Sequence, residues 1–175
     1  MGNQQSGEFE ELTKRAMDQL RQGSSHVGYR CELQALLLPS TGDCIGYEIF
    51  TPVRRAGDPV LAVKTVWKRT QDQQKFESPL ARMKYGARLE PTLSHTKIPV
   101  SHDYVSALLE RASNLAVQVR VPVPSLGLDG TSYELAVGDY WAVARFHWWE
   151  SPPNGWRSVR DLWVAIKAFM DLVAP

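Results

Sequence analysis

The chain has 175 residues, is 43% hydrophobic, and carries 20 Lys and Arg against 19 Asp and Glu, for a formal net charge of +1. That length suits a single domain with a sizeable core, and the near-neutral charge argues against a nucleic-acid-binding protein, which is usually more basic. No apolar run is long enough to span a membrane and no secretory signal opens the chain, so we expect a soluble cytoplasmic protein.

The first seven residues predict a flexible leader, ahead of a single domain over residues 8–175. The run from Met1 to Ser6 fits the pattern for N-terminal myristoylation, in which the exposed glycine is acylated. Only two positions of that pattern are constrained, and glutamates rather than lysines follow it. A single acyl chain without a basic patch anchors weakly, so we favour a solvated leader and leave the acylation of Gly2 open.

The N-terminal third predicts one helix followed by an antiparallel meander. From Glu8 to Arg21 apolar residues recur at helical spacing, and residues 27–38 then alternate between apolar and polar side chains, as half-buried strands do. After the turn-forming loops 39–43 and 54–59 the alternation resumes, at Ile45, Tyr47 and Ile49 and then at Leu61, Val63, Thr65 and Trp67. Short connections join neighbouring strands, so three antiparallel strands are expected.

The two cysteines, Cys31 and Cys44, fall in the first two of these strands. If the first hairpin turns about Thr41, Cys31 lies opposite the region of Thr51 and Cys44 lies opposite Leu38, too far apart for a disulfide. We therefore expect two reduced thiols. No C-x-x-C pattern or histidine pair accompanies them, which argues against a metal site.

The stretch from Arg69 to Val100 has few apolar residues and no clear period. The overlapping segment from Lys64 to Arg88 holds seven Lys or Arg against two Asp or Glu, which would suit a basic patch for an acidic partner. We favour a solvated loop or an edge strand, which such charges protect from pairing. Ser78-Pro79 could start a short helix, and an extended piece is expected over residues 95–100.

The next segment predicts a helix over residues 101–116, for which Ser101 is a natural N-cap. Pro122 and the following Pro124 keep the valine-rich stretch, residues 117–123, out of a central strand. Residues 131–137 alternate as a strand, and Gly138-Asp139 suits a two-residue type II′ turn into a return strand.

The return strand, residues 140–149, leads through a proline-rich corner to a final helix over residues 158–173. Ser158 followed by Asp161 resembles a capping box, and we expect these residues to start that helix. Its apolar residues recur on one face, which predicts packing on a sheet. They are Val159, Leu162, Trp163, Ile166, Phe169, Met170 and Val173.

The segments together predict an α+β fold: an antiparallel β-sheet of about five or six strands with two main amphipathic helices packed on one face, plus a short N-terminal helix. The chain holds no P-loop, no dinucleotide-binding glycine pattern, no nucleophile elbow and no H-E-x-x-H, and its four histidines are scattered. This lowers the expectation of an enzyme without excluding one, and neither cofactor nor metal is expected.

Six residues around the C-terminal hairpin are candidates for a binding site: Asp129, Glu134, Arg145, His147, Trp149 and Trp156. An aromatic pocket holding a few polar groups is a usual profile of a binding site. The alternatives are that Asp129 only caps a turn, that Arg145 and His147 lie on a wet sheet face, and that the tryptophans close the core.

The two neighbouring tryptophans of the return strand point to opposite faces, because side chains alternate along a strand. Trp148 shares its face with Ala142, Ala144 and Phe146 and is the core candidate. Trp149 shares its face with Arg145 and His147, and we expect it to be the more exposed and the more suited to contact a ligand or partner.

The run Leu128-Asp129-Gly130-x-x-Tyr133, a strand ending in Trp148-Trp149, a proline and a closing amphipathic helix resemble the C-terminal half of a group of small uncharacterised bacterial proteins. The similarity covers about residues 101–173. It implies an α+β domain and a bacterial origin, and it implies no catalytic residue because that group has no settled activity.

Two function classes follow from the sequence. The first is a non-catalytic protein-binding module, such as an inhibitor, an immunity-type protein or a regulator, for which a homodimer is also allowed. The second is a small-molecule-binding protein or enzyme with a cleft near His147, Asp129 and Glu134. A deep pocket enclosing these side chains would favour the second class, and a flat or convex aromatic patch would favour the first.

Overall fold

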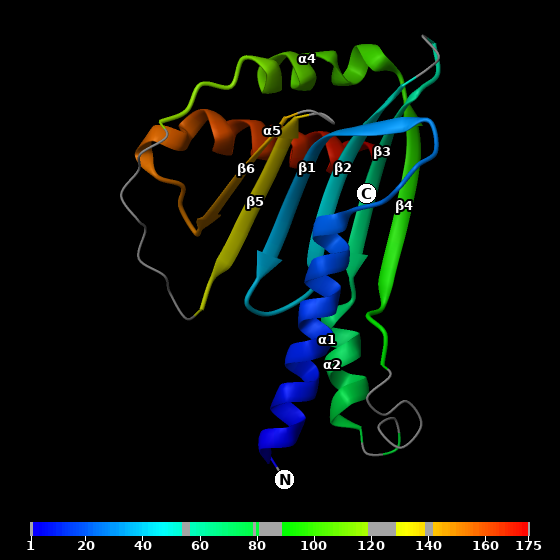
Figure 1. Ribbon diagram of the computed structural model, residues 1–175, viewed down its shortest axis with the longest axis vertical. Helices are drawn as coiled ribbons and strands as arrows, with labels where there is room; N and C mark the ends of the chain where they lie inside the picture. The colour runs from blue at the N-terminus through cyan, green and yellow to red at the C-terminus, as the bar shows by residue number, and fades with distance from the viewer. Residues whose placement is uncertain are drawn as a thin grey trace.

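The protein is an α+β fold built on one six-stranded antiparallel sheet (Figure 1). The computed structural model describes residues 2–53, 57–78, 80, 89–118, 129–138 and 142–174, with only the backbone of residues 2–6. The elements in chain order are α1 (Gly2–Gln22), β1 (Tyr29–Pro39), β2 (Cys44–Pro52), β3 (Val60–Trp67), α2 (Arg69–Glu77), β4 (Leu93–Val100), α4 (His102–Ser113), β5 (Thr131–Gly138), β6 (Val143–Trp149), the 3-10 helix η2 (Asn154–Trp156) and α5 (Arg157–Val173).

The strands lie in the order β4-β3-β2-β1-β5-β6, and every neighbouring pair is antiparallel. The predicted meander of β1, β2 and β3 is confirmed, and β4 pairs with β3 at one edge. Cys31 lies opposite Phe50, and both cysteines are free thiols. The central strand β1 joins the meander to the C-terminal hairpin, because it pairs with β2 on one side and with β5 on the other.

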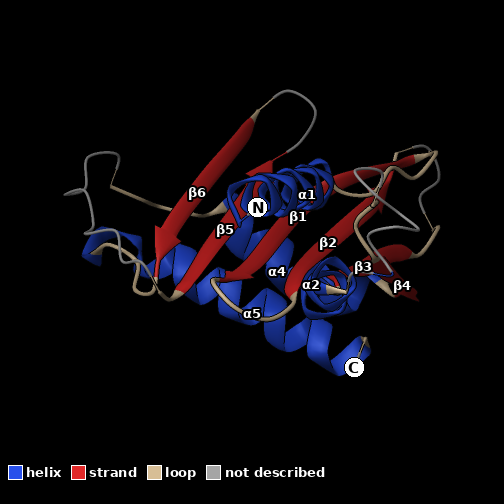
Figure 2. Ribbon diagram, turned by 90° about the horizontal axis from the view of Figure 1, so that it is seen from below, coloured by secondary structure: helices blue, strands red, loops and turns tan. Residues whose placement is uncertain are grey.

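One face of the sheet packs against α4 and α5. The stripe of α5 is buried at Val159, Leu162, Trp163, Ile166 and Met170, as its helical period predicts. These side chains meet the alternate strand residues that share their face, among them Leu33, Ala35, Tyr47, Ile49, Leu135 and Trp148. Figure 2 shows α5 on this side of the sheet and α1 on the other.

Within the described residues, α1 packs on part of the opposite face. Its residues Ala16 and Leu20 pack against Leu36, Cys44 and Trp67 on the sheet. The N-terminal half of α1 extends past the lower end of the strands and lies beside α2 (Figure 1). The rings of Phe9 and Phe76 join these two helices edge to face, with their centroids 5.7 Å apart.

The N-terminal helix is longer than predicted. It begins at Gly2, so that residues 2–7, expected to be a flexible leader, have helical backbone. With 21 residues α1 exceeds both α5 with 17 and α4 with 12, so the expected division into two main helices and a short N-terminal one does not describe this structure. The predicted start of this helix was too late because its apolar stripe begins only at Phe9.

Two local predictions about the C-terminal half are wrong. Gly138 pairs with Val143, so the connection is longer than the predicted two-residue turn; residues 139–141 lie outside the described residues. Ser158 does not cap α5, because the helix starts at Arg157 and the Ser158 hydroxyl donates to the carbonyl of Ala116 at 2.8 Å.

The predicted N-cap of α4 is confirmed, since the Ser101 side chain accepts a hydrogen bond from the backbone N–H of Asp103. The polar stretch after β3 contains the helix α2, where a loop was favoured, and β4 is the expected edge strand. Most of the valine-rich stretch 117–123 and part of the basic stretch that ends at Arg88 lie outside the described residues. Among the described helices, none combines the length and the apolar character needed to cross a membrane.

Candidate functional site

Four of the six candidate residues lie together on the sheet face that α1 partly covers. Glu134 of β5 lies opposite His147 of β6, and the neighbouring pairs of the register place Arg145 and Trp149 on the same face. Cross-strand partners of an antiparallel pair point to one side of the sheet, so this proximity is fixed by the register. We call the three side chains Arg145, His147 and Trp149 the β6 surface.

An ion pair fixes α1 beside the β6 surface. The guanidinium of Arg21 donates to both carboxylate oxygens of Glu134, with Nη2–Oε1 at 2.7 Å and Nε at 3.2 Å from each oxygen. The hydrogen bond to Glu134 is the main cause that raises the pKa of Arg21 above its usual range. Both carboxylate oxygens of Glu134 therefore accept hydrogen bonds from Arg21.

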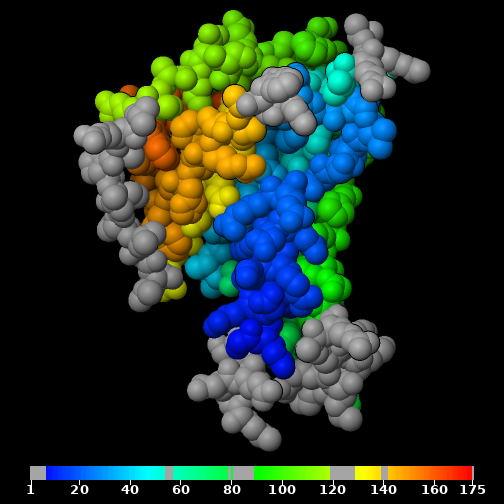
Figure 3. Space-filling model, in the orientation of Figure 1, coloured from blue at the N-terminus to red at the C-terminus, as the bar shows by residue number. Residues whose placement is uncertain are grey.

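Arg145 and His147 are exposed and make no hydrogen bond or ion pair with any described residue. Together with α1 they border an open groove of about 590 Å³. Its lining includes Asp18 and Arg21 from α1 and Gln34, Glu134 and Ala136 from the strands. In Figure 3, α1 (blue) and β6 (orange) flank this hollow, with β5 (yellow) visible between them.

Trp149 and Trp148 occupy the faces that the sequence predicted. Trp148 is 2% exposed, stacks on Tyr133 with the ring planes 8° apart, and belongs to the main core. Trp149 is half-buried, and its ring lies against Gly130, where an added Cβ would approach ring atom Cζ2 to 2.7 Å. Gly130 has φ +149°, so glycine suits both the backbone and the ring contact at this position.

Asp129 and Trp156 lie away from Arg145 and His147. Asp129 is exposed just before β5, in a turn where Ser40 and Gly130 exchange hydrogen bonds, so the turn interpretation fits its place. Trp156 packs edge to face on Phe146, which points into the core, and its Nε1 donates to the carbonyl of Gln118 at 3.0 Å. A shared cleft of His147 with Trp156 is therefore not formed, because Phe146 and His147 point to opposite faces of β6.

A buried carboxylate that the sequence analysis did not single out lies beneath the C-terminal end of α1. Glu48 is 3% exposed and accepts hydrogen bonds from the backbone N–H of Ser24 at 3.1 Å and from the Ser24 hydroxyl at 2.9 Å. Burial raises the pKa of Glu48, and the bonds from Ser24 and Gln34 oppose that change. The signal that could have found it is Gly23-Ser24, a helix-ending glycine with φ +67° followed by a hydroxyl donor.

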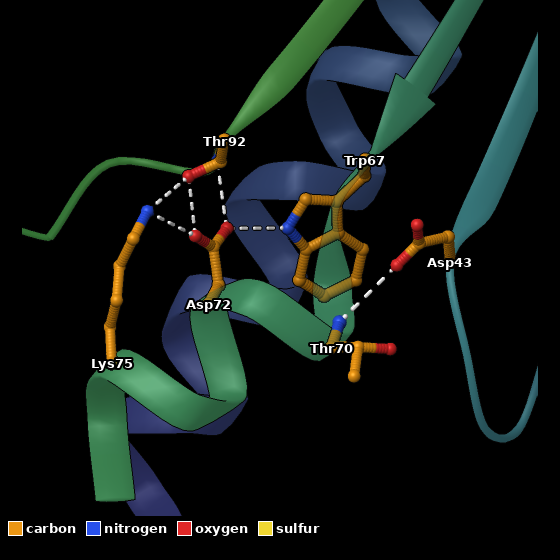
Figure 4. Close-up of polar contacts among 6 residues, drawn as sticks. All are labelled: Asp43, Trp67, Thr70, Asp72, Lys75 and Thr92. Atoms are coloured by element: carbon orange, nitrogen blue, oxygen red, sulfur yellow. Dashed lines mark hydrogen bonds and ion pairs between the residues drawn. The ribbon is translucent and has the colours of Figure 1, made fainter. Parts of the chain in front are cut away.

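A second buried carboxylate, Asp72, holds α2 against the sheet (Figure 4). Its Oδ2 accepts from Trp67 Nε1 at 2.9 Å and from the Thr92 N–H at 2.7 Å, while Oδ1 accepts from the Thr92 hydroxyl and from Lys75 Nζ at 3.1 Å. Burial by itself raises the pKa of Asp72, but these bonds outweigh it and leave the pKa lowered. We call these four residues the Asp72 clasp; every oxygen is satisfied, so its role is structural.

Two observations concern metal binding and thiol chemistry. The described residues contain no group of three or more His, Cys, Asp or Glu side chains arranged to hold a metal ion. Burial raises the pKa of Cys31 to about 12 and that of Cys44 to about 11, which suppresses the thiolate that a nucleophile needs. Comparison with protein-family models, with curated proteins and with solved structures found no match to this chain.

Proposed function

We propose that this chain is a non-catalytic protein-binding module, of inhibitor, immunity or regulatory type and of bacterial origin, whose partner contacts the β6 surface. The observation that carries the proposal is the row formed by Arg145, His147 and Trp149. These side chains project from alternate positions of one strand, and Arg145 and His147 are exposed and without partners among the described residues. Tryptophan and arginine are the side chains most enriched at the energetic centres of protein interfaces.

The β6 surface also has the rigidity that favours binding. Its residues stand on a strand paired along its length with β5, and the ring of Trp149 is held by Gly130. Ordered side chains lose less conformational entropy when a partner binds, so more of the contact energy appears as affinity. Opposite charges from Asp18 and from the Arg21–Glu134 pair border the surface, and such mixed polarity suits a folded protein surface.

Site-specific crosslinking tests this proposal. A photo-reactive p-benzoylphenylalanine replaces Trp149 and, as a matched control, the exposed Val164 on the outer side of α5. We expect a defined protein adduct from position 149 and none from position 164. Adducts between two copies of this chain would identify a homodimer as the partner complex.

The crosslinked partner is then purified and titrated calorimetrically against variants. Trp149→Ala should weaken binding by about 2 kcal/mol, roughly 30-fold, the scale of an interface hot spot. Arg160→Ala removes one charge from α5 and should leave the affinity unchanged. A partner that binds Trp149→Ala and Arg145→Ala as tightly as the wild type would contradict the proposal.

The groove beside the β6 surface favours small-molecule binding as the second candidate function. It is lined by Glu134, Arg145 and His147, and its volume of about 590 Å³ is within the usual size of a ligand site, about 300–1,000 Å³. Amide chemical shifts that respond to a metabolite library only around this groove, and that disappear with Arg145→Ala, would support this function over the first.

A further inference from the structure

A second pocket lies on the other side of α1, and it is independent of the β6 surface. It has a volume of about 430 Å³ and lies between the C-terminal end of α1, the segment that follows it, and strands β2, β3 and β4. Leu20, Val63 and Leu93 give it an apolar floor. Because His26 stands at its wall with two further basic side chains, His95 and Lys97, we call it the His26 pocket.

Three basic side chains converge in the His26 pocket without a carboxylate partner. His95 and Lys97 are two positions apart on β4 and therefore share a face. Lys97 Nζ lies 3.5 Å from His26 Nδ1, and His95 Nδ1 lies 3.0 Å from the hydroxyl of Thr65. None of the three forms an ion pair with the described residues.

Two observations show that His26 lies in an unfavourable electrostatic environment. Its pKa is lowered, first by burial and then by the charges of Lys97 and His95. An ammonium group only donates, so a hydrogen bond across the 3.5 Å contact between Lys97 Nζ and His26 Nδ1 requires the neutral tautomer with its proton on Nε2. That Nε2 is hidden from solvent and has no hydrogen-bond partner among the described residues. A cluster of basic groups without an ion-pair partner is stabilised by an anion beside it.

The acid in the pocket lining limits the charge of such an anion. Glu48 contributes to the wall; its oxygens accept from Ser24 and Gln34, and it forms no ion pair with Lys97 among the described residues. A dianion would meet the Glu48 charge as well as the basic groups. A monoanion balances the one permanent positive charge, Lys97, and the apolar floor requires a hydrocarbon group rather than a bare inorganic ion.

We propose that the His26 pocket binds a small organic monoanion: a carboxylate, placed between Lys97 and the two histidines, that carries an apolar group over Leu20, Val63 and Leu93. The ligand class follows from the pairing of a basic rim with an apolar floor. The proposed site contains no residue of the β6 surface, so it can be tested independently of the proposed function.

The test uses the full chain and 4-phenylbutanoate as the probe, followed by amide and histidine ring chemical shifts. We expect saturable shifts at the residues lining the His26 pocket, and a rise in the lowered pKa of the His26 ring when the probe is bound, because an anion stabilises the imidazolium form. The neutral isostere 4-phenylbutan-1-ol should bind about tenfold more weakly, since it lacks the charge-assisted bonds. The amine 4-phenylbutylamine should not bind in the pocket.

Variants of single residues test whether the probe binds in the His26 pocket. Lys97→Met keeps the aliphatic stem on an exposed edge-strand position, so the fold should persist, and the probe should bind about tenfold more weakly. His95→Gln should weaken it by a few-fold, and Arg160→Ala on α5 should leave it unchanged.

Five outcomes would overturn the proposal, and four of them concern the pocket itself. They are no saturable shift with millimolar probe, equal binding of the alcohol and the carboxylate, unchanged binding to Lys97→Met, and occupation of the pocket by inorganic phosphate but not by the probe. Shifts confined to the groove beside β6 would also overturn it while supporting the second candidate function.

Discussion

Replacing Asp72 by asparagine should destabilise the protein by about 2–4 kcal/mol. The carboxylate is fully buried and accepts four hydrogen bonds, whereas the amide has one oxygen. In its best orientation the amide oxygen keeps the hydrogen bonds from Trp67 Nε1 and from the Thr92 N–H. The NH₂ group then faces Lys75, so the charge-assisted hydrogen bond from Lys75, worth about 1.5–3 kcal/mol, is lost. The retained bonds also weaken, because charge-assisted bonds are roughly twice as strong as neutral ones.

Urea denaturation at neutral pH measures this change, and thermal melting should show a decrease of about 5–15 °C for a chain of this size. The control is Asp161→Asn, which removes the same charge from an exposed pair with Arg160 and should cost about 0–1 kcal/mol. An Asp72→Asn variant within about 0.5 kcal/mol of the wild type would refute the reasoning, because the desolvation of the carboxylate would then cancel its bonds.

The pH dependence of the same variant provides a second check. Because the pKa of Asp72 is lowered on folding, the stability from its charge is present above the ordinary carboxyl pKa of about 4. It is lost as the pH falls through the lower pKa of the folded state. The difference between wild type and Asp72→Asn should therefore shrink below about pH 4, and a constant difference would contradict the assigned ionisation.

Three further predictions concern the core and the buried titratable groups. Trp148→Ala should cost about 3–5 kcal/mol in denaturant unfolding, whereas Trp149→Ala should cost less; the reverse order would show that the two faces are misassigned. Burial raises the pKa of Glu48, so the wild type should gain stability relative to Glu48→Gln as the pH falls from neutral through the raised pKa, and a flat difference would contradict this. Since burial raises the pKa of Cys31 to about 12, iodoacetamide at about pH 8 should alkylate it far more slowly in the native than in the urea-unfolded chain; equal rates by mass spectrometry would disprove its protection.

The strand faces of the C-terminal hairpin could be predicted because the side-chain period of a strand is two. The predicted turn at Gly138-Asp139 was wrong, yet Tyr133 and Trp148 still share the core face. The register differs from the predicted one by an even number of residues, and only an odd slip exchanges the two faces of a strand. Alternation along the sequence was therefore a safer guide than turn chemistry.

Helix α2 and the clustering of basic groups could not be predicted from local patterns. Residues 69–77 have no apolar stripe, and the helix is held instead by one buried carboxylate, Asp72, whose partners include Thr92, well beyond the helix. His26 meets Lys97 only because β4 lies next to β3 and the end of α1 crosses the sheet. Such contacts depend on the order of the strands in the sheet, and the local patterns of a single sequence do not determine that order.

The sequence grouped Trp156 with His147, and the structure separates them for a related reason. The position of Trp156 after two prolines suggested an exposed corner near His147, but η2 turns the ring onto Phe146 on the opposite face. The backbone path between β6 and α5 decides this outcome, and it passes through Glu150, which has a positive φ of 53°. Neither fact can be derived from the spacing of aromatic residues.

The position of β1 between β2 and β5 has a consequence for how the chain folds. The strands of the β1–β2 hairpin are close together in the sequence. By contrast, Ala35 of β1 pairs with Leu135 of β5, which is synthesised much later. During synthesis the meander is complete while the other edge of β1 is still an unpaired template for foreign strands. Closing so long a loop is slow, which lengthens that exposure. Pairing of the C-terminal hairpin with β1 therefore removes this edge from contact with other chains.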